Sequence, residues 1–159
     1  MDLGSGGGLP GLVLAVGWPG SQWVLLDSNR RRTCHLEQAV ADLGLEARVV
    51  VMTGRAEDLV GATTRATFQL VVTRSFAKPA VTAECAAPYL VEGGRLVVSE
   101  PPAGSPSRWH PEGLACLGMK LEGPLLRVGG GSFQAIVQVS ECPAKFPRGT
   151  GVAARRPLF

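Results

Sequence analysis

The stretch Asp2-Leu3-Gly4-Ser5-Gly6-Gly7-Gly8-Leu9-Pro10-Gly11 decides the fold of this chain. An acidic residue is followed at alternate positions by Gly4, Gly6 and Gly8, and then by an apolar run over residues 12–16. Glycines at this density let the backbone turn sharply and leave room for a ligand. The first N–H groups of a helix have no partner within the helix and suit an electron-rich ligand. The stretch therefore predicts a strand, loop and helix that cradle a nucleotide-type molecule.

The register of the glycines indicates which nucleotide is bound. The hexapeptide from Gly6 to Gly11 fits G-x-G-x-x-G, the dinucleotide fingerprint. Read from Asp2, the same glycines fit the acidic-plus-glycine pattern of S-adenosylmethionine (SAM) methyltransferases. In that pattern the acidic side chain lies at the methionine end of the cofactor, whose ammonium group favours a nearby negative charge. We therefore prefer SAM and keep a nicotinamide dinucleotide as the alternative.

Composition predicts one globular domain over residues 1–159. Hydrophobic residues make up 45% of the chain and charged residues 18%, which argues against disorder. We expect a cytoplasmic protein without a membrane partner, because no apolar run approaches the roughly 20 residues of a membrane span and no secretory leader is evident. The cysteines are scattered and form no metal-binding pattern, so we expect no metal. The net charge of +3 is uneven, and the basic tail over residues 142–159 suggests a polyanionic partner.

The run Trp23-Val24-Leu25-Leu26-Asp27 predicts a strand that ends in an acidic residue. In nucleotide-binding α/β folds this position lies beside the glycine loop, where a carboxylate accepts hydrogen bonds from both ribose hydroxyls. Asp27 follows the glycines by about 20 residues, as that geometry requires. We therefore expect Asp27 to bind the ribose of the cofactor.

The rest of the chain alternates between predicted strands and helices. We expect a helix capped by Ser28 and ended by Gly44, and a second helix over residues 80–90 closed by Gly93-Gly94. This alternation predicts a Rossmann-like α/β fold, with a mostly parallel twisted sheet, helices on both faces and a C-terminal antiparallel hairpin. Only residues 1–3 remain for the first central strand, so we expect that strand and the helices before it to be missing. The predicted strands are 23–27, 48–52, 68–72, 95–99, 125–128 and 133–139.

Several stretches together resemble one methyltransferase family, the glucose-inhibited division protein B family of small-subunit ribosomal RNA guanine-N7 methyltransferases. The resemblance covers nearly the whole chain, and it implies a class I SAM-dependent fold. Ser99-Glu100-Pro101-Pro102 departs from the family, which tends to have Lys-Gly at this point. The stretches that carry the resemblance are residues 2–11, Leu25-Leu26-Asp27-Ser28, Gly54-Arg55-Ala56-Glu57, Thr73-Arg74-Ser75-Phe76-Ala77 and the basic tail from Lys145 to Leu158.

The resemblance implies a role for particular residues. Gly4 and Leu9 would line the SAM pocket, and Ala56 and Glu57 would hold the adenosine. Arg74 would sit at the mouth, facing cofactor and RNA, as the catalytic residue. Pattern and resemblance together give the cofactor-binding set Asp2, Gly4, Gly6, Gly8, Leu9, Asp27, Ala56, Glu57 and Arg74. The expected RNA-binding residues are Arg74, Lys145, Arg148, Arg155 and Arg156.

The chemistry implied by the family agrees with the residues present. Thr73-Arg74-Ser75-Phe76 is not the N-P-P-[FY] loop of enzymes that methylate exocyclic amines, and Cys142-Pro143 reverses the Pro-Cys order of pyrimidine C5 enzymes. Guanine N7 carries a free lone pair and needs no general base. We therefore predict methyl transfer from SAM to a guanine N7 of 16S ribosomal RNA, free or in a small-subunit precursor. The alternatives are an inactive, shortened SAM- or RNA-binding remnant and an NAD-dependent oxidoreductase.

Overall fold

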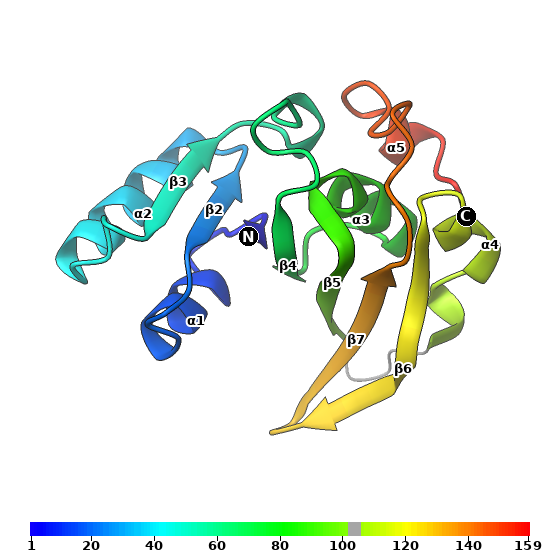
Figure 1. Ribbon diagram of the computed structural model, residues 1–159. Helices are drawn as coiled ribbons and strands as arrows, with labels where there is room; N and C mark the ends of the chain where they lie inside the picture. Colours follow the sequence, from blue (N-terminus) through cyan, green and yellow to red (C-terminus); the bar gives the residue numbers. More distant parts are fainter. Residues whose placement is uncertain (102–105) are drawn as a thin grey trace.

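A computed structural model describes residues 1–101 and 106–159. Its seven strands form one sheet in the order β3-β2-β1-β4-β5-β7-β6 (Figure 1). Strands β1 to β5 pair in parallel, whereas β7 runs antiparallel to β5 and β6. The predicted α/β fold with a closing antiparallel hairpin is confirmed. The elements are β1 (Asp2–Leu3), α1 (Gly11–Gly17), β2 (Trp23–Asp27), α2 (Arg30–Asp42), β3 (Val49–Thr53), η1 (Ala56–Asp58), β4 (Phe68–Arg74), α3 (Pro79–Ala86), η2 (Ala87–Tyr89), β5 (Leu90–Glu100), η3 (Pro106–Arg108), α4 (Pro111–Ala115), β6 (Met119–Val128), β7 (Gly131–Gln138) and α5 (Val152–Arg155).

The central strands are buried on both faces of the sheet. Successive side chains of a strand point to opposite faces, so a doubly covered strand needs apolar residues at consecutive positions. Leu26 and Val71 belong to one apolar cluster, whereas their neighbours Leu25 and Val72 belong to the other. In Figure 1, α1 and α2 lie beside β2 and β3, and α3, α4 and α5 lie beside the other half of the sheet. The unbroken apolar runs in the sequence follow from this double covering.

Strand β1 is short but central. Asp2 pairs with Leu25 of β2 and with Val72 of β4, and Leu3 pairs with Leu26. The expectation that the first strand would be missing is therefore wrong in one respect, because two residues occupy its position. The pairing of Asp2 on both sides keeps β2 and β4 in one sheet.

Helix α2 begins one residue later than the sequence suggested. The capping residue is Asn29, not Ser28, and its Oδ1 accepts a hydrogen bond from the Arg31 N–H at 3.0 Å. Asn is as good a helix cap as Ser, so the local sequence allowed either position. The Ser28 side chain is instead at the edge of the cavity described below.

The Gly93-Gly94 pair lies inside β5 and does not close a helix. The strand begins at Leu90, and its register against β4 shifts between Phe68 and Leu70. A Cβ at Gly94 would lie 2.8 Å from the Val91 carbonyl oxygen. The glycine is therefore needed for close approach of the backbone at an irregularity in the strand.

Candidate functional site

A cavity of about 270 Å³ opens at the carboxyl ends of β1, β2 and β4. The carboxyl ends of parallel strands meet at one edge of a sheet, and ligands of such folds bind there, where the strand order reverses. In this sheet the reversal falls at β1, between β2 and β4. The lining residues are Gly4, Leu26, Asp27, Ser28, Arg32, Gly54, Arg55, Ala56, Glu57, Ser75, Phe76, Ala77, Val81, Cys85 and Ala154.

The glycine loop forms one side of this cavity. Gly4 and Gly6 have φ values of +76° and +56°, in the left-handed region that side chains rarely adopt. A Cβ at Gly4 would fall 2.5 Å from Cδ2 of Phe76, so the loop and the segment after β4 approach as closely as the backbone allows. Gly4 lies on the cavity wall, and its predicted contact with the cofactor stays a prediction. Gly6 is next to this wall because its N–H donates to Asp27.

Two other residues of the loop lie away from the cavity. A Cβ at Gly8 would fall 2.4 Å from Cδ1 of Leu12, so Gly8 packs against α1. The Leu9 side chain is 48% exposed and is not on the cavity wall. Neither residue lines the cavity, and their predicted contact with the cofactor stays a prediction.

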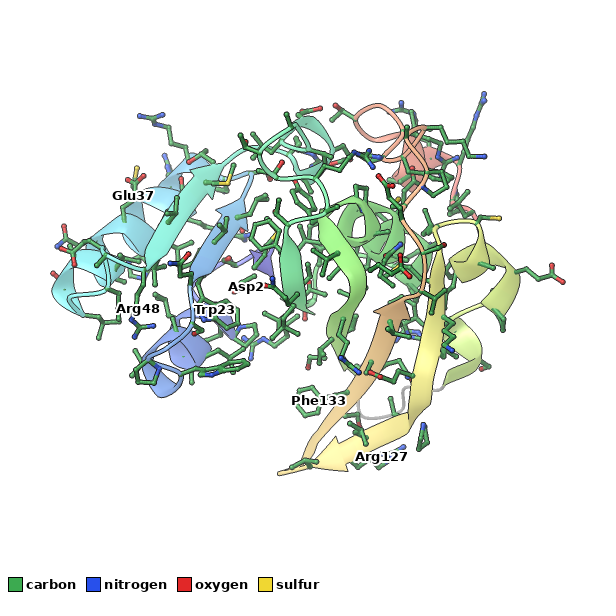
Figure 2. All side chains as sticks on the ribbon, in the orientation of Figure 1. Asp2, Trp23, Glu37, Arg48, Arg127 and Phe133 are labelled. Atoms are coloured by element: carbon green, nitrogen blue, oxygen red, sulfur yellow. The ribbon has the colours of Figure 1, made fainter. Side chains whose placement is uncertain are left out.

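The Asp2 carboxylate lies behind the loop and not in the cavity. Its side chain is completely buried near the middle of the molecule (Figure 2), and its Oδ2 accepts a hydrogen bond from the Gly11 N–H at 2.9 Å. This contact fastens the first turn of α1 to β1. Burial raises the pKa of Asp2 to about 6, against the lowering effects of the Gly11 N–H, Ser5, the amino group of Met1 and Arg74. Oδ1 is buried without a hydrogen-bond partner among the described residues.

Asp27 occupies the position predicted for the ribose ligand. Its carboxylate is 5% exposed and lines the cavity at the tip of β2. Oδ2 accepts a hydrogen bond from the Gly6 N–H at 2.9 Å, and Oδ1 accepts one from the Asn29 N–H at 2.8 Å. Each carboxylate oxygen can accept a further hydrogen bond. Asp27 thus shapes the glycine loop and keeps capacity for ribose hydroxyls, a role that stays a prediction.

The turn η1 supplies Ala56 and Glu57 to the same cavity. The Tyr89 hydroxyl donates to the Ala56 carbonyl oxygen at 2.7 Å and anchors the turn to the core. The Glu57 side chain is 4% exposed, and its Oε1 accepts a hydrogen bond from the Gly151 N–H at 3.1 Å. The structure therefore joins the predicted adenosine-binding turn to the C-terminal part of the chain, a contact that the sequence did not indicate.

A second cavity, of about 470 Å³, adjoins the first. The two share residues 75–77 as a common wall. Arg74 lines the second cavity and not the first, and its positive charge acts on the buried Asp2. The remaining lining residues of the second cavity are Thr73, Pro79, Thr82, Val98, Ser99, Glu100, Pro101, Arg108 and Trp109.

The end of β5 carries a buried acid that the sequence did not single out as a site. Glu100 is 6% exposed, and it accepts a hydrogen bond from the Trp109 indole N–H at 2.7 Å. It also forms an ion pair with Arg108. Trp109 is buried as expected of a packing residue. An acidic residue that directly follows an apolar strand was the only signal for this cluster.

Cys85 lines the first cavity as a buried thiol. Burial raises the pKa of its thiol to about 12, so the thiolate is scarce at neutral pH. This agrees with the exclusion of cysteine-dependent chemistry from the sequence. No group of His, Cys, Asp and Glu side chains over residues 1–101 and 106–159 is arranged to hold a metal ion. Over the same residues, no helix has the length and apolar character to span a bilayer.

The basic tail folds back onto the body of the protein. Arg148 forms a two-pronged ion pair with the buried Glu84, with Nε to Oε1 at 2.8 Å and Nη2 to Oε2 at 2.5 Å. The expectation that Arg148 binds RNA is corrected, because its guanidinium is engaged by this carboxylate. Lys145, Arg155 and Arg156 are exposed, as an RNA-binding role requires.

The comparison with known families agrees with this geometry. The family described as "rRNA small subunit methyltransferase G" matches residues 1–100 of the chain. The chain belongs to this family. Two relatives that carry the name "Ribosomal RNA small subunit methyltransferase G" come from Parasynechococcus marenigrum and Prochlorococcus marinus. They are 36% and 35% identical to the chain over 166 and 172 residues. These matches cover 99% of this chain but 66% and 67% of the relatives, so the chain spans about two thirds of their length.

Solved structures show that the family fold is shared with other methyltransferases. A 16S rRNA (adenine(1408)-N(1))-methyltransferase mutant from Catenulisporales acidiphilia superposes with a TM-score of 0.73 and 16% identity, covering 89% of this chain and 85% of that one. An RNA methyltransferase from Salinibacter ruber, in complex with S-adenosyl-L-homocysteine, gives 0.60 and 18%, covering 90% and 82%. At these identities the likeness establishes the class I methyltransferase fold.

Proposed function

We propose that this protein transfers a methyl group from SAM to N7 of a guanine in 16S ribosomal RNA. The observation that carries the proposal is the pair of adjoining cavities, which share residues 75–77 at the carboxyl edge of the sheet. One cavity holds the residues predicted to bind the cofactor, and the other presents Arg74. Family membership supplies the reaction and the class of RNA. The proposal includes a cytoplasmic location and either free RNA or a small-subunit precursor as substrate.

The residues of the first cavity fit SAM. Gly6 and Gly7 leave open backbone in the loop, because a Cβ built at Gly6 would approach only the Gly4 carbonyl oxygen, at 3.9 Å, and one built at Gly7 would meet no heavy atom within 4 Å. Asp27 would hold the ribose hydroxyls, and the turn of Ala56 and Glu57 would hold the adenosine. When bound, the cofactor supplies an electrophilic methyl group.

The chain's own residues need only align the reactants. Guanine N7 attacks through its lone pair and loses no proton, so no general base is required. Correct alignment of nucleophile and methyl group alone is worth up to about 7–11 kcal/mol. Phe76 lies in the wall between the cavities, and its ring packs against the Gly4 backbone. This ring can orient a base in the second cavity by stacking, which contributes about 1–3 kcal/mol.

RNA binding is proposed for the exposed cations near this edge. Arg74 faces the second cavity, and Lys145, Arg155 and Arg156 belong to the exposed part of the tail. Each phosphate contact on single-stranded RNA should add about 0.7 to the slope of log affinity against log salt. Substituting Arg74 with Gln should lower that slope and methyl transfer together. An unchanged slope would remove Arg74 from the RNA contacts.

The proposal is tested with the purified full chain in two steps. Thermal melts with S-adenosylhomocysteine (SAH) or NAD come first, because a ligand at a hundredfold excess over its Kd stabilises by about 2.7 kcal/mol. We expect SAH alone to raise the melting temperature. Transfer of a labelled methyl group to 16S ribosomal RNA and to small-subunit particles follows, with strand scission at N7-methylguanine as the readout. Stabilisation by NAD, or SAH binding without transfer to either RNA, would contradict the proposal.

A further inference from the structure

We infer that residues 142–156, here called the C-terminal segment, form a wall of the cofactor cavity, and that Arg148 is the positioning residue that holds this wall in place. The inference rests on the proposed function, because that proposal assigns the cavity to SAM. It changes the expected role of the segment. The sequence presents it as a basic tail for RNA, whereas the structure builds it into the site where the cofactor would bind.

The main anchor of the segment lies in α3. Glu84 is completely buried, and both of its carboxylate oxygens accept hydrogen bonds from the Arg148 guanidinium. The Arg148 backbone N–H adds a third bond to Glu84 Oε1 at 3.0 Å. The next residue of α3, Cys85, lines the cofactor cavity. The ion pair therefore fixes the segment directly behind the cavity wall.

Beyond Arg148 the segment reaches the adenosine-binding turn. The Gly151 N–H donates to Glu57 Oε1 at 3.1 Å, and the Thr150 hydroxyl donates to the Asp58 carboxylate. One turn further, Ala154 of α5 lines the cavity itself. A loss of the Arg148 anchor would therefore disturb Glu57 and remove part of the wall at the same time.

Before Arg148 the segment is held by Arg65. The Arg65 guanidinium donates to the carbonyl oxygen of Cys142 at 3.3 Å and to that of Phe146. Cys142 and Phe146 are themselves buried in the larger apolar cluster. The segment is thus fastened on both sides of Arg148, and its course over α3 and η1 is fixed by contacts with the body of the protein.

The same contacts separate Arg148 from the RNA-binding cations. An RNA phosphate could take the place of Glu84 at Nε and Nη2 of Arg148 only by leaving this buried carboxylate without its charged partner, which is strongly unfavourable. The hydrogen bonds that Arg148 donates to Glu84 raise the pKa of Arg148, so its guanidinium stays charged in the neutral range. Lys145, Arg155 and Arg156 carry no such constraint from a buried acid.

The test compares Arg148→Gln with Arg95→Gln in the full chain. Arg95 forms an equally two-pronged pair with Glu122, with Nε and Nη2 at 2.6 and 2.7 Å from the carboxylate, on an exposed surface outside both cavities. SAH affinity is measured by calorimetry, and binding of a 16S ribosomal RNA fragment is measured against salt. We expect Arg148→Gln to weaken SAH binding about tenfold or more, as loss of a buried bidentate pair should. The slope of log RNA affinity against log salt should match wild type.

Two further variants, Arg148→Lys and Glu84→Gln, are measured in the same way. Arg148→Lys keeps the positive charge but cannot contact both carboxylate oxygens of Glu84 at once. We therefore expect it to recover only part of the SAH affinity that Arg148→Gln loses. Glu84→Gln leaves no buried charge and gives the same readout if Arg148→Gln does not fold. SAH affinity within about twofold of wild type in Glu84→Gln, or a salt slope lowered by about 0.7 in Arg148→Gln, would overturn the inference. Failure of the wild-type chain to bind SAH would instead overturn the proposed function.

Discussion

Two arginine–carboxylate pairs in this protein share one geometry and differ in their surroundings. In both, Nε and Nη2 of the arginine contact the two carboxylate oxygens, at 2.8 and 2.5 Å for Arg148 with Glu84 and at 2.6 and 2.7 Å for Arg95 with Glu122. The side chains of the first pair are 26% and 0% exposed, and those of the second are 53% and 37% exposed. The distances alone would rank the two pairs as equals.

Their surroundings make them unequal. An exposed pair gains little, because water screens both charges and solvates either partner when the other leaves. A buried carboxylate that loses its partner is left in a medium that cannot solvate it. Glu84 therefore depends on Arg148, whereas Glu122 does not depend on Arg95. A hydrogen-bond length describes a contact, but burial decides what its loss costs.

The largest effect is expected from Arg148→Gln. This change leaves the Glu84 carboxylate buried and uncompensated, and breaking a buried pair in this way costs about 3–5 kcal/mol. Equilibrium unfolding in urea measures the loss against wild type. A loss of stability below about 1 kcal/mol, as for a surface pair, would show that water solvates the Arg148–Glu84 pair. The two ion pairs would then not differ in their contribution to stability.

Asp2 is a buried acid that has no two-pronged ion pair with an arginine, so it tests the effect of burial by itself. Burial raises the pKa of Asp2 from its ordinary value of 3.8 to about 6. As the pH falls, Asp2 therefore binds its proton in the folded protein before it does so in the unfolded chain. The stabilisation of the folded protein by this proton is complete below pH 3.8, and it is lost as the pH rises through about 6. The difference between 3.8 and about 6 corresponds to about 3 kcal/mol, at about 1.36 kcal/mol for each pKa unit.

Asp2→Asn isolates this contribution. The amide can still accept the Gly11 N–H but carries no charge, so we expect the variant to be more stable than wild type at pH 7.5 and equal to it near pH 4. Urea unfolding of both proteins across this range gives the difference. Groups that do not interact with Asp2 cancel in it, whereas the Met1 amino group, whose pKa burial lowers to about 5, interacts with Asp2 and contributes to it. A difference that does not change with pH would mean that Asp2 is not buried as an anion.

A smaller effect is expected from Glu84→Gln. The variant leaves no buried charge, its amide oxygen can still accept from Arg148, and Arg148 can reach water from its 26% exposed position. We expect a loss of about 1.5–3 kcal/mol, the range of a hydrogen bond to a charged group. Urea unfolding beside Arg148→Gln checks the asymmetry, and equal losses for the two variants would contradict it.

The smallest effect is expected from Arg95→Gln. Both partners are exposed, so each is solvated when the other is removed. We expect no measurable change in the midpoint of thermal unfolding, in low salt or in high salt. A clear destabilisation of Arg95→Gln that disappears in high salt would contradict this expectation. It would show that Arg95 stabilises the fold through long-range charge interactions.

The sequence was informative where the signal is local. The apolar runs predicted β2, β3 and β4 to within two residues, and the glycine loop predicted the place of Gly4 and Asp27 at one cavity. These features depend on residues close together in the chain. Gly93-Gly94 misled the prediction, because a glycine pair has the same local appearance in a turn and in an irregular strand.

The contacts that define the site beyond this were not predictable from local pattern. Glu84 and Arg148 are 64 residues apart, and Glu57 and Gly151 are 94 apart. Arg148 has the same local sequence character as Arg155, yet one is engaged by a buried acid and the other is exposed. Only the folded chain shows which cation has a buried partner. The same holds for Asp2, whose carboxylate was expected at the cofactor and instead fastens α1.

The short central strand β1 affects how fast the backbone amides of the sheet exchange their hydrogen with solvent. Two residues join β2 to β4, whereas β5 and β7 pair over six. We expect backbone amides of β5 and β7 to exchange with deuterium most slowly, and those along β1 faster, although β1 lies at the centre. The first cavity, which we propose as the cofactor site, spans this junction of β2 and β4, with Asp27 on one side and Phe76 on the other. A bound cofactor would therefore contact both halves of the sheet and hold them together. We expect it to slow amide exchange in β1 more than in β6, at the edge of the sheet.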